Sequence, residues 1–357
     1  MEEYYQRQLD CLCGQVRPLS EEAKEASVCH WDGIAKPLNG LGRFETILTQ
    51  IVGIQRTENL SLDRKAVVVF CADNGVVEEG VSQTDSSVTA IVTENFARGI
   101  ASVNRMASTV GAEVLPVDIG VAGELHEPGI RNMKVDFGTK NFCREMAMTR
   151  EQALEAIHNG IALAGELKDA GYDILAVGEM GIGNTTTSSA IASVLLDVDP
   201  EAVTGKGAGL SDEGLTRKID AIRRGIALHH PAADDPIGVL ASLGGFDIAG
   251  MTGLMLGGAI SRIPVVLDGI ISEVAGLLAM AICPQTVSYL IPSHLGKEPA
   301  CAQIYERLHL EPVIHGNLAL GEGTGAVMLF PLLDMAWEVY KENSTFEDIH
   351  VKAYEKL

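Results

Sequence analysis

Short apolar runs alternate with longer helical patterns along most of the chain, and this alternation constrains the fold more than any other feature. Five runs are predicted strands, at 66–72, 113–118, 173–178, 263–269 and 286–291. Their continuous apolar character is typical of strands buried on both faces. Helical patterns separate them, at about 89–110, 150–170, 185–196, 212–229, 248–261 and 271–282. This order predicts an α/β fold in which helices cover both faces of a parallel sheet.

The two ends of the chain differ from its middle. Residues 1–60 are polar, and KPLNGLGRFETILTQIVGIQ predicts an amphipathic helix after a Pro/Gly turn. Residues 297–357 also have a mostly helical pattern. We therefore expect residues 1–60 and 297–357 to form a smaller, mainly helical domain beside a large α/β domain of residues 61–296.

The balance of charge narrows the possible partners. The 357 residues include 27 Lys and Arg against 48 Asp and Glu, for a net charge of −21. Such a surface repels phosphate backbones, so no nucleic-acid partner is expected, although a small phosphorylated ligand could bind in a shielded pocket. The N-terminal segment lacks the apolar region of a signal peptide, and no run reaches the roughly 18 apolar residues that span a bilayer. We expect a cytoplasmic protein that does not bind a membrane.

The seven cysteines do not form a metal-binding pattern. Cys11 and Cys13 form one C-x-C pair, but no second pair follows at zinc spacing. We interpret the cysteines as reduced structural thiols. A metal site built from Cys11, Cys13, Cys29 and His30 is the alternative, and no metal or other cofactor is predicted.

Acidic residues follow four of the predicted strands. Asp73, Asp118, Glu179 and Asp268 each come at the end of an apolar run and precede a glycine or a turn. Because the carboxyl ends of parallel strands meet at one edge of the sheet, these acids are expected to share the edge where ligands bind. Alternatively, each acid caps the turn or helix that follows it.

Two glycine-rich segments are candidate phosphate sites. In GEMGIGNTTTSSA the glycines allow close approach of the backbone, and a helix N-terminus with added hydroxyls follows. Its candidate residues are Gly181, Gly183, Asn184, Thr185 and Thr186. The second segment, TGKGAGLSDEGLTRKIDAIRR, offers Gly205, Gly207 and Lys218. Neither matches a Walker A or G-x-G-x-x-G pattern, and helix capping or a flexible loop is the alternative. His294, in a third polar loop, is interpreted as a structural histidine.

The segment LGEGTGA places Glu322 between two glycines, next to an apolar helix pattern. Burial beside apolar surface would raise the pKa of this carboxyl towards the range of a general base. A nearby helix N-terminus would instead lower it. The sequence leaves both possibilities open.

Taken together, the motifs resemble one family. GEMGIGNTT, KGAGL…TRKIDAIRR, LGGFDIAGMTGLMLGGA, PVVLDG, YLIPSHL and LGEGTGA occur in the order seen in nicotinate-nucleotide–dimethylbenzimidazole phosphoribosyltransferases. The resemblance covers essentially the whole chain. It implies a doubly wound, Rossmann-like domain with a small helical domain built from both chain ends, in a homodimer that needs no metal cofactor.

The resemblance also implies a reaction. The family transfers the phosphoribosyl group of nicotinate mononucleotide to a lower-ligand base of cobamides, such as 5,6-dimethylbenzimidazole, with Glu322 as general base. Glu179 would stabilise the ribose as its bond to nicotinate breaks. The expected nucleotide-binding residues are Gly181, Gly183, Asn184, Thr185, Thr186, Gly205, Gly207, Lys218, Asp247 and Asp268, and Ser82, Thr84 and Val92 are the expected base-binding residues.

Three positions depart from relatives. Asn74 stands where many relatives have His, Gly296 where some have a Ser near the phosphate, and Val92 where some have a Gln in the base pocket. Two alternative functions make different predictions. A Rossmann-type oxidoreductase would need a G-x-G-x-x-G motif after the first strand, where CADNGVVEEG stands. A protein that senses the base or the nucleotide would bind its ligand without turnover.

Overall fold

The computed structural model describes residues 1–58 and 60–354 and contains one six-stranded parallel sheet. Its strands are β1 (Lys65–Ala72), β2 (Ala112–Gly120), β3 (Arg131–Asn132), β4 (Ile174–Met180), β5 (Val265–Leu267) and β6 (Leu290–Pro292). Their order is β3-β2-β1-β4-β5-β6. The chain builds the sheet outward from β1 in one direction and then, from β4, in the other. This is the doubly wound order, and the predicted α/β fold class is confirmed.

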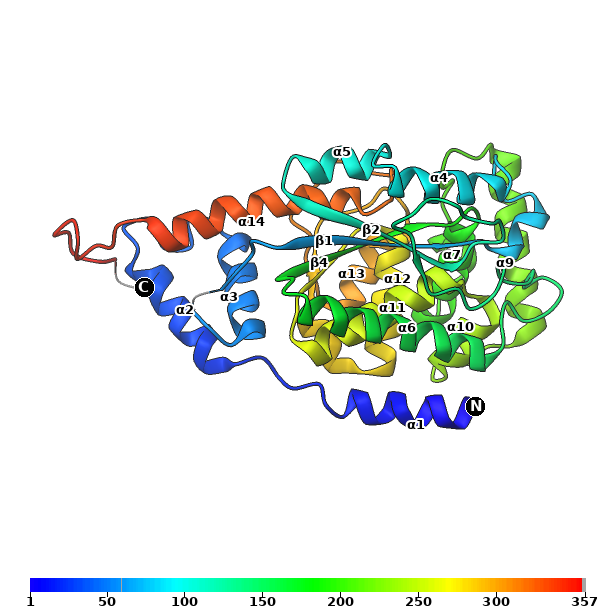
Figure 1. The fold of residues 1–357 in the computed structure, drawn as a ribbon, viewed down its shortest axis with the longest axis horizontal. Coiled ribbons are helices and arrows are strands. Elements are labelled where there is room, and N and C mark those ends of the chain that lie inside the picture. The colour runs from blue at the N-terminus through cyan, green and yellow to red at the C-terminus, as the bar shows by residue number, and fades with distance from the viewer. Residues whose placement is uncertain (59, 355–357) are drawn as a thin grey trace.

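Helices cover both faces of the sheet (Figure 1). One face carries α6 (Arg150–Asp169), α10 (Pro236–Leu243), α11 (Phe246–Ser261) and α12 (Ile270–Ile282), and its core includes Val68 and Phe70 of β1. The other face carries α4 (Ser87–Ala97), α5 (Ser102–Ser108) and α14 (Thr324–Glu342), and its core includes Val67 and Val69. Since β1 is buried along its whole length, its continuous apolar run follows from its place in the middle of the sheet.

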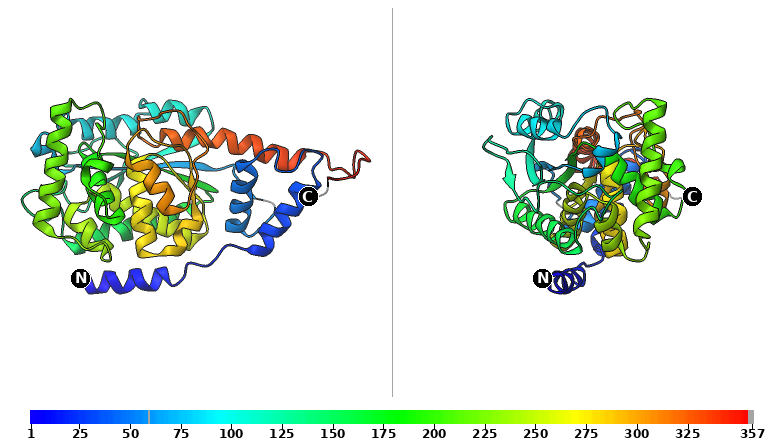
Figure 2. Two further views of the ribbon diagram at one scale, coloured as in Figure 1. Left: turned by 180° about the vertical axis from the view of Figure 1, so that it is seen from behind. Right: turned by 90° about the vertical axis from the view of Figure 1, so that its right-hand side faces the viewer.

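Further helices lie at the edges and ends of the molecule. They are α1 (Glu2–Cys13), α2 (Glu21–Gly33), α3 (Arg43–Gln55), α7 (Asn184–Leu196), α8 (Pro200–Val203), α9 (Asp212–His229) and α13 (Ala300–Leu308), with 3₁₀ helices η1 (Gly75–Glu79) and η2 (Pro284–Tyr289). Helices α2 and α3 pack with the far end of α14 beyond the sheet, as the left view in Figure 2 shows. By contrast, α1 packs against α6, and α13 packs against α7 and α12. The domain bounds at residues 60 and 296 stay a prediction.

Several predicted elements differ from those observed. The single helix expected at 89–110 is two helices, because the chain turns at Gly99, whose φ is +72°. Most of the strand expected at 286–291 is the 3₁₀ helix η2, and only the short strand β6 follows it. The two-residue strand β3 and the helices α8 and α10 were not predicted. Asp235 caps α10 by accepting the N–H of Gly238 at 3.0 Å, so an Asp-Pro start signal was present in the sequence.

Candidate functional site

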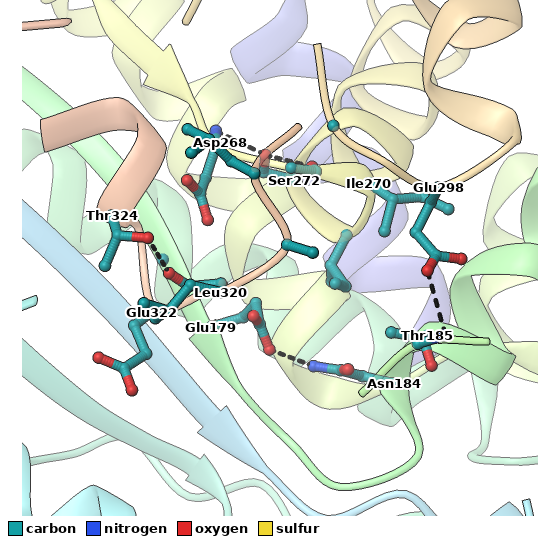
Figure 3. A pocket seen from close by; sticks show the side chains of 18 of the residues that line it. Glu179, Asn184, Thr185, Asp268, Ile270, Ser272, Glu298, Leu320, Glu322 and Thr324 are labelled. Carbon is teal, nitrogen blue, oxygen red and sulfur yellow. Dashed lines mark hydrogen bonds between the residues drawn. The ribbon is translucent and has the colours of Figure 1, made fainter. Parts of the chain in front are cut away.

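A cavity of about 330 Å³ opens at the carboxyl ends of β4, β5 and β6 (Figure 3). Its walls come from the loop after β4, the start of α12, the loop after β6 and the turn before α14. The predicted site residues that line it are Glu179, Gly181, Asn184, Thr185, Gly207, Asp268, Glu322 and Val92. This edge of the sheet, beside the point where the strand order reverses, is where ligands bind in doubly wound folds.

The turn that carries Glu322 is left-handed at three consecutive residues. The φ angles of Gly321, Glu322 and Gly323 are +83°, +61° and +88°. A side chain at Gly321 would overlap Glu179, and one at Gly323 would come within 2.7 Å of Val67. Both neighbours of Glu322 must therefore be glycine, and Glu322 itself adopts a conformation that non-glycine residues rarely take. Such backbone geometry is common at functional sites.

Asp268 fixes this turn to the sheet. One oxygen of its carboxylate accepts the N–H of Gly325 at 2.7 Å and that of Ala326 at 3.3 Å, and the other accepts the N–H of Gly323 at 3.1 Å. The acid at the end of β5 therefore caps α14, a much later helix, whereas the alternative interpretation had each acid cap the turn or helix that directly follows it, which here is α12. It also lines the cavity, where burial raises its pKa against the opposing effect of His294.

The Glu322 carboxylate lies beside the N-terminus of α5. Its Oε2 accepts the backbone N–H of Val103 at 2.9 Å. Figure 3 shows the side chain directed away from both Glu179 and Asp268. Burial raises the pKa of Glu322, while the N–H groups of Val103 and Ser102 lower it, and burial has the larger effect. Burial and a helix N-terminus, the two effects expected from the sequence, both act on Glu322. The net rise in its pKa favours a general base.

Glu179 and Asn184 in the cavity wall form a polar network with Asp247, which is buried behind them. The side-chain amide of Asn184 donates to Glu179 and, at 3.0 Å, to Asp247. Burial raises the pKa of Glu179 to about 7, and the nearby charges of Asp247 and Asp268 add to this shift. Burial likewise raises the pKa of Asp247 to about 6. Asp247 does not line the cavity, so its role in this structure is to hold Asn184.

We expect the Glu179→Gln variant to become more stable, relative to wild type, as the pH rises. In wild type the folded state keeps a proton on Glu179 that the unfolded state has lost, so stability falls between about pH 4 and 7. Gln cannot lose a proton. The free energy of unfolding of the Glu179→Gln variant minus that of wild type should therefore rise by roughly 1–3 kcal/mol between pH 4 and 8, as measured by urea denaturation. The exposed Glu25→Gln control should show no such rise, and a pH-independent difference for Glu179→Gln would contradict the expectation.

Lys218 lies beneath the second glycine-rich loop. Its side chain is fully buried, and its Nζ donates to Thr185 Oγ1 at 2.9 Å and to the carbonyl oxygen of Gly205 at 3.1 Å. It forms no ion pair with any carboxylate that the structure describes. Burial lowers the pKa of Lys218 to about 8, partly opposed by nearby Glu298. The two predicted phosphate segments therefore meet at Thr185 and Gly207, above a buried cation.

Of the remaining predicted residues, Val92 lines the cavity and the others lie outside its wall. Gly183, with φ +95°, allows the turn into α7, and Thr186 is buried within that helix. On the expected base side, Val92 of α4 lines the cavity, while Ser82 and Thr84 lie in the loop before α4 and do not. Thr89, which sequence reasoning missed, joins α4 to the site because its Oγ1 accepts the N–H of Ile182 at 3.2 Å.

The alternative metal site is not assembled. Over residues 1–58 and 60–354, no group of three or more His, Cys, Asp or Glu side chains is placed to hold a metal ion. His30 instead contacts the carbonyl oxygen of Tyr340 at 2.7 Å, and all seven cysteines are free thiols. No helix in the described part of the chain is long and apolar enough to cross a membrane.

Known proteins are similar to this chain in sequence and in fold. A family model described as Phosphoribosyltransferase matches residues 16–351. Nicotinate-nucleotide–dimethylbenzimidazole phosphoribosyltransferase of Acetivibrio thermocellus is 45% identical over 91% of this chain and 92% of its own. The enzyme of the same name from Ruminiclostridium cellulolyticum is 44% identical over 96% of this chain and 97% of its own. The chain belongs to the nicotinate-nucleotide–dimethylbenzimidazole phosphoribosyltransferase family.

A solved structure of this phosphoribosyltransferase family shares the fold. The nicotinate-nucleotide–dimethylbenzimidazole phosphoribosyltransferase of Thermus thermophilus superposes with a TM-score of 0.87 and 38% identity, covering 94% of this chain and 99% of its own. A second structure from that organism, named CobT, gives a TM-score of 0.89 with 38% identity, covering 93% of this chain and all of the other.

The packing around Gly296, where the resemblance to this phosphoribosyltransferase family predicts a departure, disfavours a serine. Gly296 lines the cavity, and a Cβ there would lie 2.8 Å from the sulfur of Cys301, which also lines it. A serine at 296 would therefore need Cys301 to move. Asn74 is buried and accepts a hydrogen bond from Thr187 at 3.4 Å, so it acts in the wall behind the network of Asn184.

Proposed function

We propose that this protein transfers the 5-phosphoribosyl group of nicotinate mononucleotide to 5,6-dimethylbenzimidazole or a related lower-ligand base. The products are nicotinate and the α-riboside 5′-phosphate, in the assembly of the cobalamin nucleotide loop. One observation carries the proposal. A single cavity has a buried lysine without an ion-pair partner among the described residues behind a glycine-rich loop at one end, and a carboxylate of raised pKa on a strained turn at the other.

The phosphate of the nucleotide would bind at the loops that meet above Lys218. Gly207 and Thr185 line this part of the cavity, and the ammonium of Lys218 supplies the positive charge that a phosphate needs. Glu179 would face the ribose. As the bond from C1′ to nicotinate breaks, its carboxylate stabilises the positive charge that develops on the sugar.

The base would lie between Val92 and the turn that carries Glu322. Glu322 accepts the ring N–H proton while the other ring nitrogen attacks C1′. The electron pair of the breaking bond returns to the pyridinium nitrogen, so nicotinate leaves with its ring neutral. Attack from the face opposite nicotinate inverts C1′, which explains an α-riboside product.

Incubation of the protein with nicotinate mononucleotide and a panel of bases tests this function. We expect release of nicotinate together with the α-riboside 5′-phosphate of at least one benzimidazole, identified by mass and by the anomeric proton signal. Nucleotide binding without any product would show a sensing protein instead, and bound NAD with hydride transfer would show an oxidoreductase.

We also propose a cytoplasmic homodimer. Seven free thiols suit a reducing compartment. Along α14, Met328 and Met335 are 41% and 59% exposed one heptad apart, and Leu320, in the turn before this helix, is 54% exposed. Such an apolar stripe beside the site is suited to pairing with a second copy. Light scattering should give twice the chain mass, and Met335→Glu should give the monomer; a monomeric wild type would refute the dimer.

A further inference from the structure

A carboxylate already occupies the end of the cavity where the proposed function places a phosphate. Glu298 lies in the loop before α13, and its Oε1 accepts the backbone N–H of Gly207 at 3.1 Å. Its Oε2 is buried and has no hydrogen-bond partner among the described residues. Figure 3 shows the side chain extending towards Thr185, the residue that also contacts Lys218.

The carboxylate lies tightly against the glycine-rich loop. A Cβ at Gly205 would overlap Glu298 Oε2, and one at Gly207 would come within 3.0 Å of Thr185 Oγ1. The absence of side chains at both positions thus leaves the loop backbone open to an anion. At present that anion is the side chain of Glu298.

The opposite charges of Lys218 and Glu298 at this end of the cavity are not joined in an ion pair. Lys218 is buried and close enough to Glu298 for the carboxylate to raise its pKa, yet the two groups are not in direct contact. The contact of Glu298 Oε1 with the Gly207 N–H is the one that a phosphate oxygen would make. A phosphate dianion carries more charge than a carboxylate and could interact with the loop and the ammonium together.

We propose that Glu298 determines specificity by occupying the phosphate subsite until the phosphate of the nucleotide displaces it. The proposal rests on the proposed function, which locates that subsite. A ligand without phosphate has nothing to exchange for the bond between Glu298 and Gly207. The side chain therefore stays in place, and an unphosphorylated riboside gains no contact there. Phosphate binding, in turn, must overcome the repulsion between two anions.

Calorimetric titration of the Glu298→Gln variant tests this inference. Gln keeps an oxygen for the Gly207 N–H but removes the negative charge. We expect its affinity for orthophosphate and for nicotinate mononucleotide to rise about 10-fold, the effect of removing one nearby like charge, while its affinity for nicotinate riboside stays the same. Glu306→Gln, an exposed change of the same charge on α13, is the matched control and should alter none of the three affinities. Glu298→Asp, whose shorter side chain withdraws from the loop, should also strengthen orthophosphate binding.

Three changes in affinity would overturn the inference. They are an unchanged or weaker affinity of Glu298→Gln for orthophosphate, an equal change for the riboside, and an equal gain in Glu306→Gln. Absence of orthophosphate binding in both wild type and Glu298→Gln would do so as well. Because orthophosphate binding is measured without turnover, this outcome is distinguishable from failure of the transferase assay.

Discussion

Replacing Glu322 with Gln is expected to lower kcat by about 10²–10⁴-fold, the usual contribution of a general base, with little change in the KM for nicotinate mononucleotide. Gln keeps an oxygen that can accept the N–H of Val103, so the turn should hold its shape. It cannot accept the proton of the attacking base. Steady-state release of nicotinate measures the effect.

The acidity of the base provides an internal control for Glu322. A benzimidazole with electron-withdrawing substituents has a more acidic N–H and needs less help in losing its proton, so the loss in Glu322→Gln should be smaller with it. The contribution of Glu322 to the acidic limb of the wild-type pH profile should also be lost in the variant, which leaves the limb due to Glu179. Wild-type turnover by Glu322→Gln, or an equal loss with every base, would remove the proposed role.

Replacing Lys218 with Met is expected to raise the KM for nicotinate mononucleotide about 10–100-fold, because a charge-assisted hydrogen bond to the phosphate is lost. The kcat should change little. In wild type, kcat/KM should fall above about pH 8, where Lys218 of the free enzyme loses its proton, and this limb should be missing in Lys218→Met.

Lys206 is the matched control for Lys218. It lies on the same glycine-rich loop but is half exposed and pairs with Asp212 at 2.6 Å. Lys206→Met should leave the KM within about twofold of wild type, since an exposed ion pair contributes little. If Lys206→Met raised the KM and Lys218→Met did not, the phosphate would bind outside the loop rather than within it. A thermal unfolding curve of each variant verifies that the fold is intact.

The sequence predicted the fold where the hydrophobic pattern is long and regular. The runs at 66–72, 113–118 and 173–178 became β1, β2 and β4, because strands in the middle of a sheet are buried on both faces. Most of the run at 286–291 is η2, in which Thr286 and Tyr289 are buried. A short buried segment has the same apolar character whether it is a strand or a turn, so the sequence could not distinguish the two. The two-residue β3 is too short to produce a pattern.

The site was predicted in part. The glycines beside Glu322 and the acids at the carboxyl ends of β4 and β5 are local signals, and Gly321, Glu322 and both acids do line one cavity. Glu298 could not be found in this way, because its contact with Gly207 joins residues 91 positions apart. Nor does local sequence indicate that Asp268 binds the backbone of a turn more than fifty residues later. Such pairings depend on how the loops meet above the finished sheet.

The bonds from Asp268 to the turn before α14 have a consequence for synthesis of the protein. Glu322 reaches the cavity only when α14 docks on β4 and the N-terminus of this helix meets Asp268. During translation, the proposed general base is therefore placed after the strand-end acids and the glycine-rich loops have been synthesised.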